Sequence, residues 1–522
     1  MMSPRTTVVT IVVCVVITTL LVFNENLGLQ RLNRLFINTA SSGGSDSVEG
    51  GNDCPPVPRP VPPEAAAAAE GGGTATSGKL FSGSKVASFD PKKLKFSKHR
   101  EDAPATKVEV FEADALRCDH WSVVTTIFEP SEAVRRQVLL KGWCIVVVGD
   151  KKGPKDYPVQ APDNNFVFLT AAQQEELAKH FPVVQALPWN HFGRKNVGFL
   201  YAILHGARVI WDFDDDNMLL SPQSILEIPG NPWVLSSPSL SQHPPSPADA
   251  KRGSINGSSS SAFTNGRSLP PTLKVVAIKS QGLGQGKGAA VSFNPYPIMG
   301  APTLPCWPRG LPLEDIKREG TNQSALYDTT LDTARVGVIQ SLANHDPDMD
   351  AIFRLTMPIP FDFPISPRPL VVPDGAYAPY NAQATLHLYS SLWSLLLPVT
   401  VHGRVSDIWR GYVAQRLGRD IGMKLLFSPP IVRQDRNSHN YLADFDSEGP
   451  LYTRAGKLIS QLDAWQPSSA SASLVARIEE LWVFLYEHGY FKAEDVTLLQ
   501  AWLQSLLAAG YQFPKISSKS SR

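Results

Sequence analysis

The sequence predicts a mixed α/β domain with a Rossmann-like, mostly parallel sheet, and three observations support this fold class. Segments rich in β-branched residues alternate with segments of helical periodicity between residues 121 and 213. Signals typical of helix starts and ends separate these segments. Of the 522 residues, 43% are hydrophobic, which is enough for a sizeable core. Repeated β-α-β units of this kind place parallel strands between layers of helices.

The first elements follow one another closely. WSVVTTIF (121–128) predicts a strand, and EPSEAVRRQVLLK (129–141) predicts a helix with Ser131 as its N-cap. WCIVVVGD (143–150) predicts a second strand, which ends at Asp150. The unit is therefore a strand, a helix and a second strand beside the first.

The alternation continues through residue 213. FVFL (166–169) predicts a strand, the next helix opens with a capping box of Thr170 and Gln173, and VVQAL (183–187) continues the pattern as a strand. RKNVGFLYAILHG (194–206) predicts a helix with apolar residues on one face and Gly206 as its C-terminal cap. The strand RVIWDF (208–213) follows at once.

The N-terminal segment predicts a membrane anchor. Residues 6–23 carry no charge over 18 residues, which is near the lower limit for a helix that spans a bilayer. A cleaved signal peptide is the alternative, although no small-x-small cleavage site follows. Basic residues flank both ends, so charge does not decide the orientation. We expect a cytosolic tail (1–5), a signal anchor (6–23) and a flexible stem (24–118) rich in Pro, Gly, Ala and Ser.

The rest of the chain divides into two parts. We expect the α/β domain to span residues 119–470, with a low-complexity surface insertion at 236–290. Residues 471–522 predict a small C-terminal helical extension of two amphipathic helices, divided near HGYFKAED (488–495).

Charge and cysteine content exclude some classes of function. The net charge is +1 and the basic residues are dispersed, which argues against a nucleic-acid partner. The five cysteines lack the spacing of a zinc or iron–sulfur site. One disulfide among Cys54, Cys118, Cys144 and Cys306 remains open, without an assigned pair.

The stretch VIWDFDDDN (209–217) carries the main chemical signal. Four carboxylates packed this closely repel one another unless a cation or hydrogen-bond donors neutralise them. They lie where a predicted strand ends, which is where α/β proteins bind ligands. Asp214 and Asp216 would hold Mn²⁺ or Mg²⁺ together with a substrate diphosphate, and Asp215 would reach a group such as a ribose hydroxyl. A calcium site or a solvated acidic turn are the alternatives.

Basic and polar residues precede this strand. Arg194, Lys195 and Asn196, from NHFGRKN (190–196), begin the preceding helix, where cations and free N–H groups suit a phosphate. Ordinary solvated charges are the alternative. Asp150, at the end of the second strand, would recognise a base or ribose, or belong to a plain polar turn.

Several ordered motifs resemble the plant STELLO family over residues 119–445. They are VVTTIFEPSEAV, PWNHFGRKNVGFLYAILHGARVIWDFDDDN, FNPYPIMGAP, PCWPRGLPL, DPDMDAIFRLT, FDFP and HGRVSDIWRGY. The resemblance implies a GT-A-like glycosyltransferase domain in a Golgi type II membrane protein that acts with cellulose synthase complexes. The family is distantly similar to the reversibly glycosylated polypeptides, whose metal-binding and UDP-sugar-binding Asp-Asp-Asp segment maps onto residues 214–216.

Further candidate residues follow. Trp307 would stack on a sugar and Arg309 would hold a phosphate or hydroxyl, or they are a buried Trp and a surface Arg. Asp407 is the candidate for the carboxylate that orients or deprotonates an acceptor hydroxyl, unless it pairs with Arg404 or Arg410. His439 is a candidate metal ligand or a structural histidine.

A second acidic group, DPDMD (346–350), is expected to form a turn or helix cap, with an acceptor-site acid as the alternative.

Together with the resemblance, these features predict a metal-dependent glycosyltransferase in the Golgi lumen. It would use Mn²⁺ or Mg²⁺, a UDP-linked nucleotide-sugar donor and a glycan or protein acceptor, in polysaccharide or glycan synthesis. The alternative, from a different class, is a non-catalytic scaffold that assists the assembly or trafficking of a polysaccharide synthase complex. A cytosolic mutase is a third candidate, against which the predicted anchor argues.

Overall fold

The computed structural model describes residues 116–220, 227–228, 231–232, 272–279, 291–317, 325–364, 368–436 and 439–517. The predicted tail (1–5), anchor (6–23) and nearly all of the predicted stem (24–118) lie outside these residues. Within the described part, no helix combines the length and the apolar character that crossing a membrane requires.

The elements of the described part follow in chain order. The strands are β1 (His120–Thr125), β2 (Cys144–Val148), β3 (Phe166–Leu169), β4 (Val209–Asp212), β5 (Asn217–Leu219), β6 (Glu227–Ile228), β7 (Asn231–Pro232), β8 (Thr272–Ile278), β9 (Val291–Ser292), β10 (Leu326–Asp332), β11 (Val336–His345), β12 (Leu370–Val371), β13 (Ala376–Tyr377), β14 (Thr385–Leu388) and β15 (Lys424–Gln434). The α-helices are α2 (Glu132–Gln137), α3 (Ala171–Ala178), α4 (Pro182–Ala186), α5 (Lys195–Leu204), α6 (Ala351–Thr356), α7 (Gly403–Asp420), α8 (Tyr441–Ser447), α9 (Gly449–Ala464), α10 (Leu474–Glu487) and α11 (Ala493–Ala508). The 3₁₀ helices are η2 (Phe192–Arg194), η5 (Leu313–Asp315), η7 (Thr333–Arg335) and η8 (Tyr389–Leu395).

One large sheet organises the domain. Its strand order is β10-β8-β12-β15-β11-β14-β4-β1-β2-β3, and β5 pairs with the end of β15. The strands β4, β1, β2 and β3 are parallel to one another. Beyond them β14 is antiparallel to both β4 and β11, whereas β11 and β15 are parallel. The mixed α/β class is confirmed; the parallel arrangement holds for the first strands, and the sheet is mixed from β4 onward.

Alternate residues of the parallel strands enter two cores. Trp121 and Val123 of β1 pack in one core, together with apolar residues of α5, α7, α10 and α11. Val124 and Val147 belong to the other core, to which α2 contributes. Both faces of this part of the sheet are therefore covered, as expected for parallel strands.

The local helix signals are confirmed. The Ser131 side chain accepts a hydrogen bond from the N–H of Val134 at the start of α2, and Thr170 and Gln173 form the capping box of α3. Gly206 follows α5 with φ of +95°, a conformation that glycine adopts without steric cost.

Two predictions need correction. Residues 183–187 do not form a strand: α4 begins at Pro182, whose fixed φ suits the first turn of a helix. The insertion predicted at 236–290 contains β8, which pairs with β10 and β12 in the main sheet. The alternation of Leu273, Val275 and Ala277 is the period-2 signal for this strand, although the composition around it obscures that signal.

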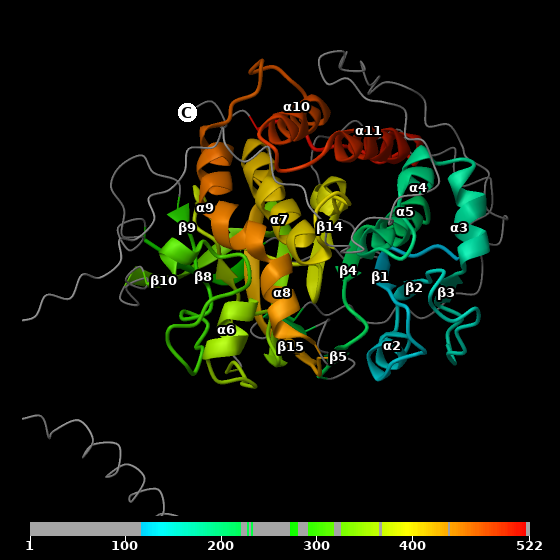
Figure 1. Ribbon diagram of the computed structural model, residues 1–522, viewed down its shortest axis with the longest axis horizontal. Helices are drawn as coiled ribbons and strands as arrows, with labels where there is room; N and C mark the ends of the chain where they lie inside the picture. The colour runs from blue at the N-terminus through cyan, green and yellow to red at the C-terminus, as the bar shows by residue number, and fades with distance from the viewer. Residues whose placement is uncertain are drawn as a thin grey trace, which may run out of the picture. The chain divides into compact units, whose positions relative to one another are not determined.

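The two C-terminal helices are confirmed as α10 and α11, and they belong to the main core. α11 lies beside α4 (Figure 1). The Trp502 indole N–H donates to the carbonyl oxygen of Trp393 at 3.0 Å, and the N–H of Val399 donates to Asp495 at 2.7 Å. The predicted extension is therefore packed onto the α/β domain.

A disulfide joins Cys118 to Cys144, with the Cα atoms 6.1 Å apart. This bond connects the segment before β1 to the first residue of β2. Cys306 is buried and has a free thiol. The pairing that the sequence left open is thus Cys118 with Cys144 within the described residues.

Candidate functional site

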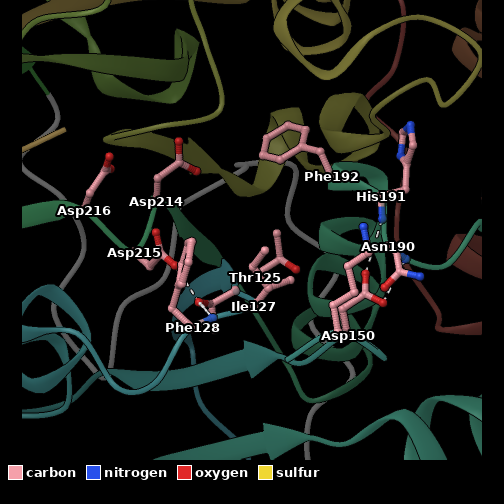
Figure 2. A pocket seen from close by; sticks show the side chains of 12 residues that line it. Thr125, Ile127, Phe128, Asp150, Asn190, His191, Phe192, Asp214, Asp215 and Asp216 are labelled. Atoms are coloured by element: carbon pink, nitrogen blue, oxygen red, sulfur yellow. Dashed lines mark hydrogen bonds between the residues drawn. The ribbon is translucent and has the colours of Figure 1, made fainter. Parts of the chain in front are cut away.

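A cavity of about 310 Å³ lies at the carboxyl ends of the parallel strands β1, β2 and β4. Strands that run in the same direction bring their last residues to one edge of the sheet, so residues distant in sequence meet there. Figure 2 shows the side chains that converge on it. The lining residues are Thr125, Thr126, Ile127, Phe128, Asp150, Lys152, Asn190, His191, Phe192, Asp214, Asp215 and Asp216.

The residues Asp214, Asp215 and Asp216, here called the aspartate triplet, occupy a turn between β4 and β5. The N–H of Asn217 donates to the carbonyl oxygen of Asp214 at 3.0 Å, and the N–H of Asp214 donates to the Asn217 side chain at 3.1 Å. Figure 2 shows Asp214 and Asp216 extending to one side of the turn and Asp215 to the other. The Thr126 hydroxyl donates to Asp215 at 2.5 Å.

Asp216 is largely enclosed although it lines the cavity. The Gln434 amide donates to Asp216 Oδ2 at 3.2 Å, and the Asn217 amide donates to Oδ1 at 3.2 Å. Burial, followed by the charge of Asp214, raises the pKa of Asp216 to about 7, against the effect of Gln434. The ionised carboxylate is therefore unfavourable here until a positive charge approaches.

Lys195 is the cation that neutralises Asp212 and Asp214. Its ammonium lies 2.7 Å from Asp212 Oδ1 and 2.9 Å from Asp214 Oδ1, and it donates to the carbonyl oxygen of Ala382 at 2.7 Å. Burial alone would lower the pKa of Lys195, but the two carboxylates outweigh it and raise that pKa. Lys195 is fully buried and acts as an internal counter-ion.

The aspartate triplet fits a divalent cation held by two carboxylates. Across the described ranges, no set of three or more His, Cys, Asp or Glu side chains could enclose a metal ion. Mg²⁺ and related cations, however, commonly use one or two protein carboxylates and complete their shell with phosphate oxygens and water. Asp214 and Asp216 line the same cavity and are the two carboxylates that would meet this smaller requirement.

The structure does not bring Arg194 and Asn196 into the cavity. Arg194 is 1% exposed, donates to Gln174 at 3.0 Å and stacks on Trp189 at 3.9 Å. Asn196 makes two hydrogen bonds with the backbone of Leu397, at 2.9 and 2.8 Å. The first turn of α5 is buried, so these donors serve the packing of the helix.

Asp150 lines the cavity and organises the loop opposite the triplet. Its carboxylate accepts from the N–H groups of Asn190 at 2.8 Å and His191 at 3.3 Å (Figure 2). The Nδ1 atom of His191 accepts the Gly193 N–H at 2.9 Å, so the neutral ring carries its proton on Nε2. Burial, followed by the nearby His402, lowers the pKa of His191 and favours this neutral form.

An apolar wall completes the cavity. Ile127 is 45% exposed and Phe128 54% exposed, although both are large hydrophobic residues. Such surface at a cavity suits the flat face of a base or sugar.

Asp407 belongs to a second, buried cluster. Arg309 contacts Asp407 Oδ2 at 2.8 Å and Asp348 Oδ1 at 2.8 Å. The N–H of Ala382 also donates to Asp407, at 3.2 Å. The partner of Asp407 is therefore Arg309, in place of the Arg404 or Arg410 considered from the sequence, and its oxygens are occupied by donors.

The remaining candidates have internal partners. Trp307 is buried and donates to Asp350 at 2.7 Å. Asp350 is the N-cap of α6, which agrees with the turn or helix cap expected for DPDMD. His439 lies 3.2 Å from Asp444, and it does not line the cavity with Asp214 and Asp216.

Sequence reasoning did not single out Thr126, Phe128, His191 and Gln434. Thr126 directly follows β1, so the rule that parallel strands end at one edge could have found it. Gln434 lies 218 residues from Asp216, and no local signal connects the two.

The fold and cavity define a mixed α/β protein with a candidate ligand site at the carboxyl edge of parallel strands. Residues 404–522 match the family model of the STELLO glycosyltransferases. The chain is 30% identical over 414 residues to "Probable glycosyltransferase STELLO2" of Arabidopsis thaliana, and 29% identical over 409 residues to "Probable glycosyltransferase STELLO1" of the same plant. Each alignment covers 77% of this chain and 46% of the relative, so the chain spans less than half the length of either.

These matches confirm the resemblance predicted from the sequence: the chain is STELLO-like. The mixed α/β fold is compatible with the GT-A-like domain expected from the sequence.

Proposed function

We propose that this protein is a glycosyltransferase that binds a nucleotide-sugar, UDP-linked, together with Mn²⁺ or Mg²⁺. The observation that carries the proposal is the aspartate triplet, which lines a cavity at the carboxyl ends of β1, β2 and β4 in a STELLO-like chain. Asp214 and Asp216 would hold the cation, which when bound would offset the charge of the donor diphosphate. The exposed apolar wall of Ile127 and Phe128 would face the base or the sugar.

The chain's own residues would prepare the site. Lys195 holds Asp214 in place from below the cavity surface, and Thr126 holds Asp215. Asp150 fixes the loop of Asn190 and His191, so that the His191 Nε2–H is available as a neutral donor toward a ligand oxygen. These contacts would fix the site before a ligand binds, which favours catalysis by positioning.

We also propose a Golgi-lumen location with residues 6–23 as the anchor. The uncharged run of 18 residues supports an anchor. The Cys118–Cys144 disulfide supports an oxidising compartment, because disulfides persist in the secretory pathway and are rare in the cytosol.

One observation favours the scaffold alternative. Asp407, the candidate for the carboxylate that activates an acceptor, is buried and paired with Arg309. A protein that kept the fold but lacked a free carboxylate to act as the catalytic base would bind a nucleotide-sugar or a partner without transferring the sugar.

Calorimetric titration of the protein with UDP, GDP and ADP, each with and without Mn²⁺, tests the proposal. We expect one diphosphate, UDP, to bind at least tenfold more tightly with Mn²⁺ present. Absence of binding by all three diphosphates in both conditions would reject the transferase and leave the scaffold.

A further inference from the structure

Two chains of hydrogen bonds connect the aspartate triplet to one loop, Tyr380–Ala384. The first, here called the lysine link, runs from Asp214 to the Lys195 ammonium at 2.9 Å and from that ammonium to the carbonyl oxygen of Ala382 at 2.7 Å. Since Lys195 has no exposure to solvent, the link lies inside the protein.

The second, here called the glutamine link, ends on Asp216. The Gln434 Nε2 donates to Asp216 Oδ2 at 3.2 Å, and the Gln383 Nε2 donates to Gln434 Oε1 at 2.7 Å. Gln434 is 3% exposed and Gln383 8% exposed. Gln434 also pairs across β15 and β5 with Asn217, the neighbour of Asp216, so the strand register sets it beside the turn.

When Asp216 is ionised, the hydrogen bonds of the glutamine link can run in one direction only. A reversed Gln434 amide would turn its oxygen toward the Asp216 carboxylate and its NH₂ toward the NH₂ of Gln383, so both contacts would become repulsive. Gln383 therefore fixes the orientation in which Gln434 donates to Asp216. Within the described residues, each Asp216 oxygen accepts one side-chain hydrogen bond, which leaves lone pairs for a cation.

The loop itself is held from its other side. The Asn381 amide donates to Asp348 at 2.6 Å, and the Ala382 N–H donates to Asp407 at 3.2 Å. Both carboxylates bind Arg309. The loop ends at Ala384 with φ of +51°, a conformation that a residue with a side chain rarely adopts and that the surrounding contacts must maintain.

We infer that Gln434 and Gln383 are positioning residues that aim Asp216 at the cation of the donor site. The inference rests on the proposed function. It goes beyond that function because it states that two amide side chains, one from β15 and one from the 380–384 loop, set the orientation of a metal ligand. Residues that orient a metal ligand typically change metal affinity 10- to 100-fold when they are replaced. Gln383 contacts Gln434 and Gln434 contacts Asp216, so Gln383 should affect the orientation of Asp216 only through Gln434.

The test measures Mn²⁺ affinity, by the EPR signal of free Mn²⁺, and UDP affinity with Mn²⁺ present, on the full chain. The variants are Gln434→Met and Gln383→Met, which keep the length of the side chain and remove its amide, and the double variant. Gln415→Met is the matched control, because Gln415 is a buried glutamine that bonds the backbone of Ala378 and Gly411 and touches neither link. Melting temperatures verify that each variant is folded.

We expect Gln434→Met to weaken Mn²⁺ binding about tenfold or more. Gln383→Met should weaken it less, the double variant should lose no more than Gln434→Met alone, and the control should bind as the wild type does. A coupling of this kind is the signature of residues that act in series. Equal Mn²⁺ affinity in folded Gln434→Met and wild type would overturn the inference, as would additive losses in the double variant.

Two further outcomes are decisive. If Gln434→Met does not fold, the Mn²⁺ affinity of Gln383→Met tests the inference instead, because this variant keeps Gln434, the direct partner of Asp216. An unchanged Mn²⁺ affinity in Gln383→Met would overturn the inference. If the wild type binds neither Mn²⁺ nor UDP, the proposed function fails and takes the inference with it. Failure of the inference alone is thus distinguished by a wild type that binds and variants that bind equally well.

Discussion

At the scale of single residues, two buried cations each lie between a pair of carboxylates. Lys195 lies between Asp212 and Asp214, and Arg309 lies between Asp348 and Asp407. Breaking such a pair on one side leaves an uncompensated charge, which typically costs about 3–5 kcal/mol. Asp216 differs, since its carboxylate accepts hydrogen bonds from the Gln434 and Asn217 amides, and burial raises its pKa to about 7. This environment is compatible with the proposed role of Asp216 as a ligand of an external cation.

A buried histidine provides a pH test at this scale. Burial lowers the pKa of His120 to about 4, against an ordinary value of 6.5, and its ring packs 5.1 Å from that of Trp143. The unfolded chain binds the proton more tightly, so the stabilising effect of a neutral His120 is complete above pH 6.5 and is lost as the pH falls toward 4. From these values, the lowered pKa of His120 should reduce the free energy of unfolding by about 2 kcal/mol when the pH falls from 7.5 to 5.

Urea unfolding of the wild type and His120→Phe at both pH values measures this. We expect the wild type to lose about 2 kcal/mol more than the variant over this interval. Equal losses in the two proteins would show that His120 is not responsible.

At the scale of elements, α5 connects the core to the site. Its first residue is Lys195, and it packs closely on the parallel strands at Gly198. A Cβ atom added at Gly198 would lie 2.6 Å from a methyl carbon of Val123 and 2.7 Å from one of Val148. The helix can approach the sheet this closely because glycine has no side chain.

Gly198→Ala should therefore destabilise the protein by about 1–3 kcal/mol, the usual cost of overpacking. Gly449→Ala is the control, since an added Cβ at Gly449, at the start of α9, meets nothing within 4 Å. Denaturant unfolding of both variants compares them. A Gly198→Ala variant as stable as the control would contradict the close packing of α5 on β1 and β2.

The elements also show which features the sequence could predict. Ser131, Thr170 and Gly206 act within a few residues of themselves, so their caps were predictable from local pattern. Asp150 and the aspartate triplet were predictable because they directly follow apolar runs. The burial of Arg194 and Asn196 was not predictable, because Asn196 bonds to Leu397, 201 residues away. Local sequence carries no record of a partner at that distance, and the same holds for Gln434.

At the scale of the whole molecule, the main prediction concerns the orientation of the chain across a membrane. We expect the chain to be a type II membrane protein, with residues 1–5 in the cytosol and the α/β domain in the lumen. Protease added to sealed microsomes should then leave everything beyond residue 24 intact, and detergent should make it accessible. Digestion of the domain in sealed vesicles would reverse this orientation.

The metal-binding role of the aspartate triplet is the central claim, and Asp216→Asn tests it most directly. The change removes one anionic ligand and nearly preserves the shape of the side chain. UDP affinity with Mn²⁺ present should fall at least tenfold, because the diphosphate loses a cation that bridges it to the protein. The melting temperature without metal should stay the same or rise, because a repelling charge is gone.

The measurement is a calorimetric UDP titration with Mn²⁺ of the wild type, Asp216→Asn and the control Asp163→Asn, an exposed position outside the cavity. We predict weakened binding in Asp216→Asn alone, with its melting temperature maintained. Unchanged UDP affinity together with a lower melting temperature in Asp216→Asn would mean that the cluster is only structural and would contradict the metal site.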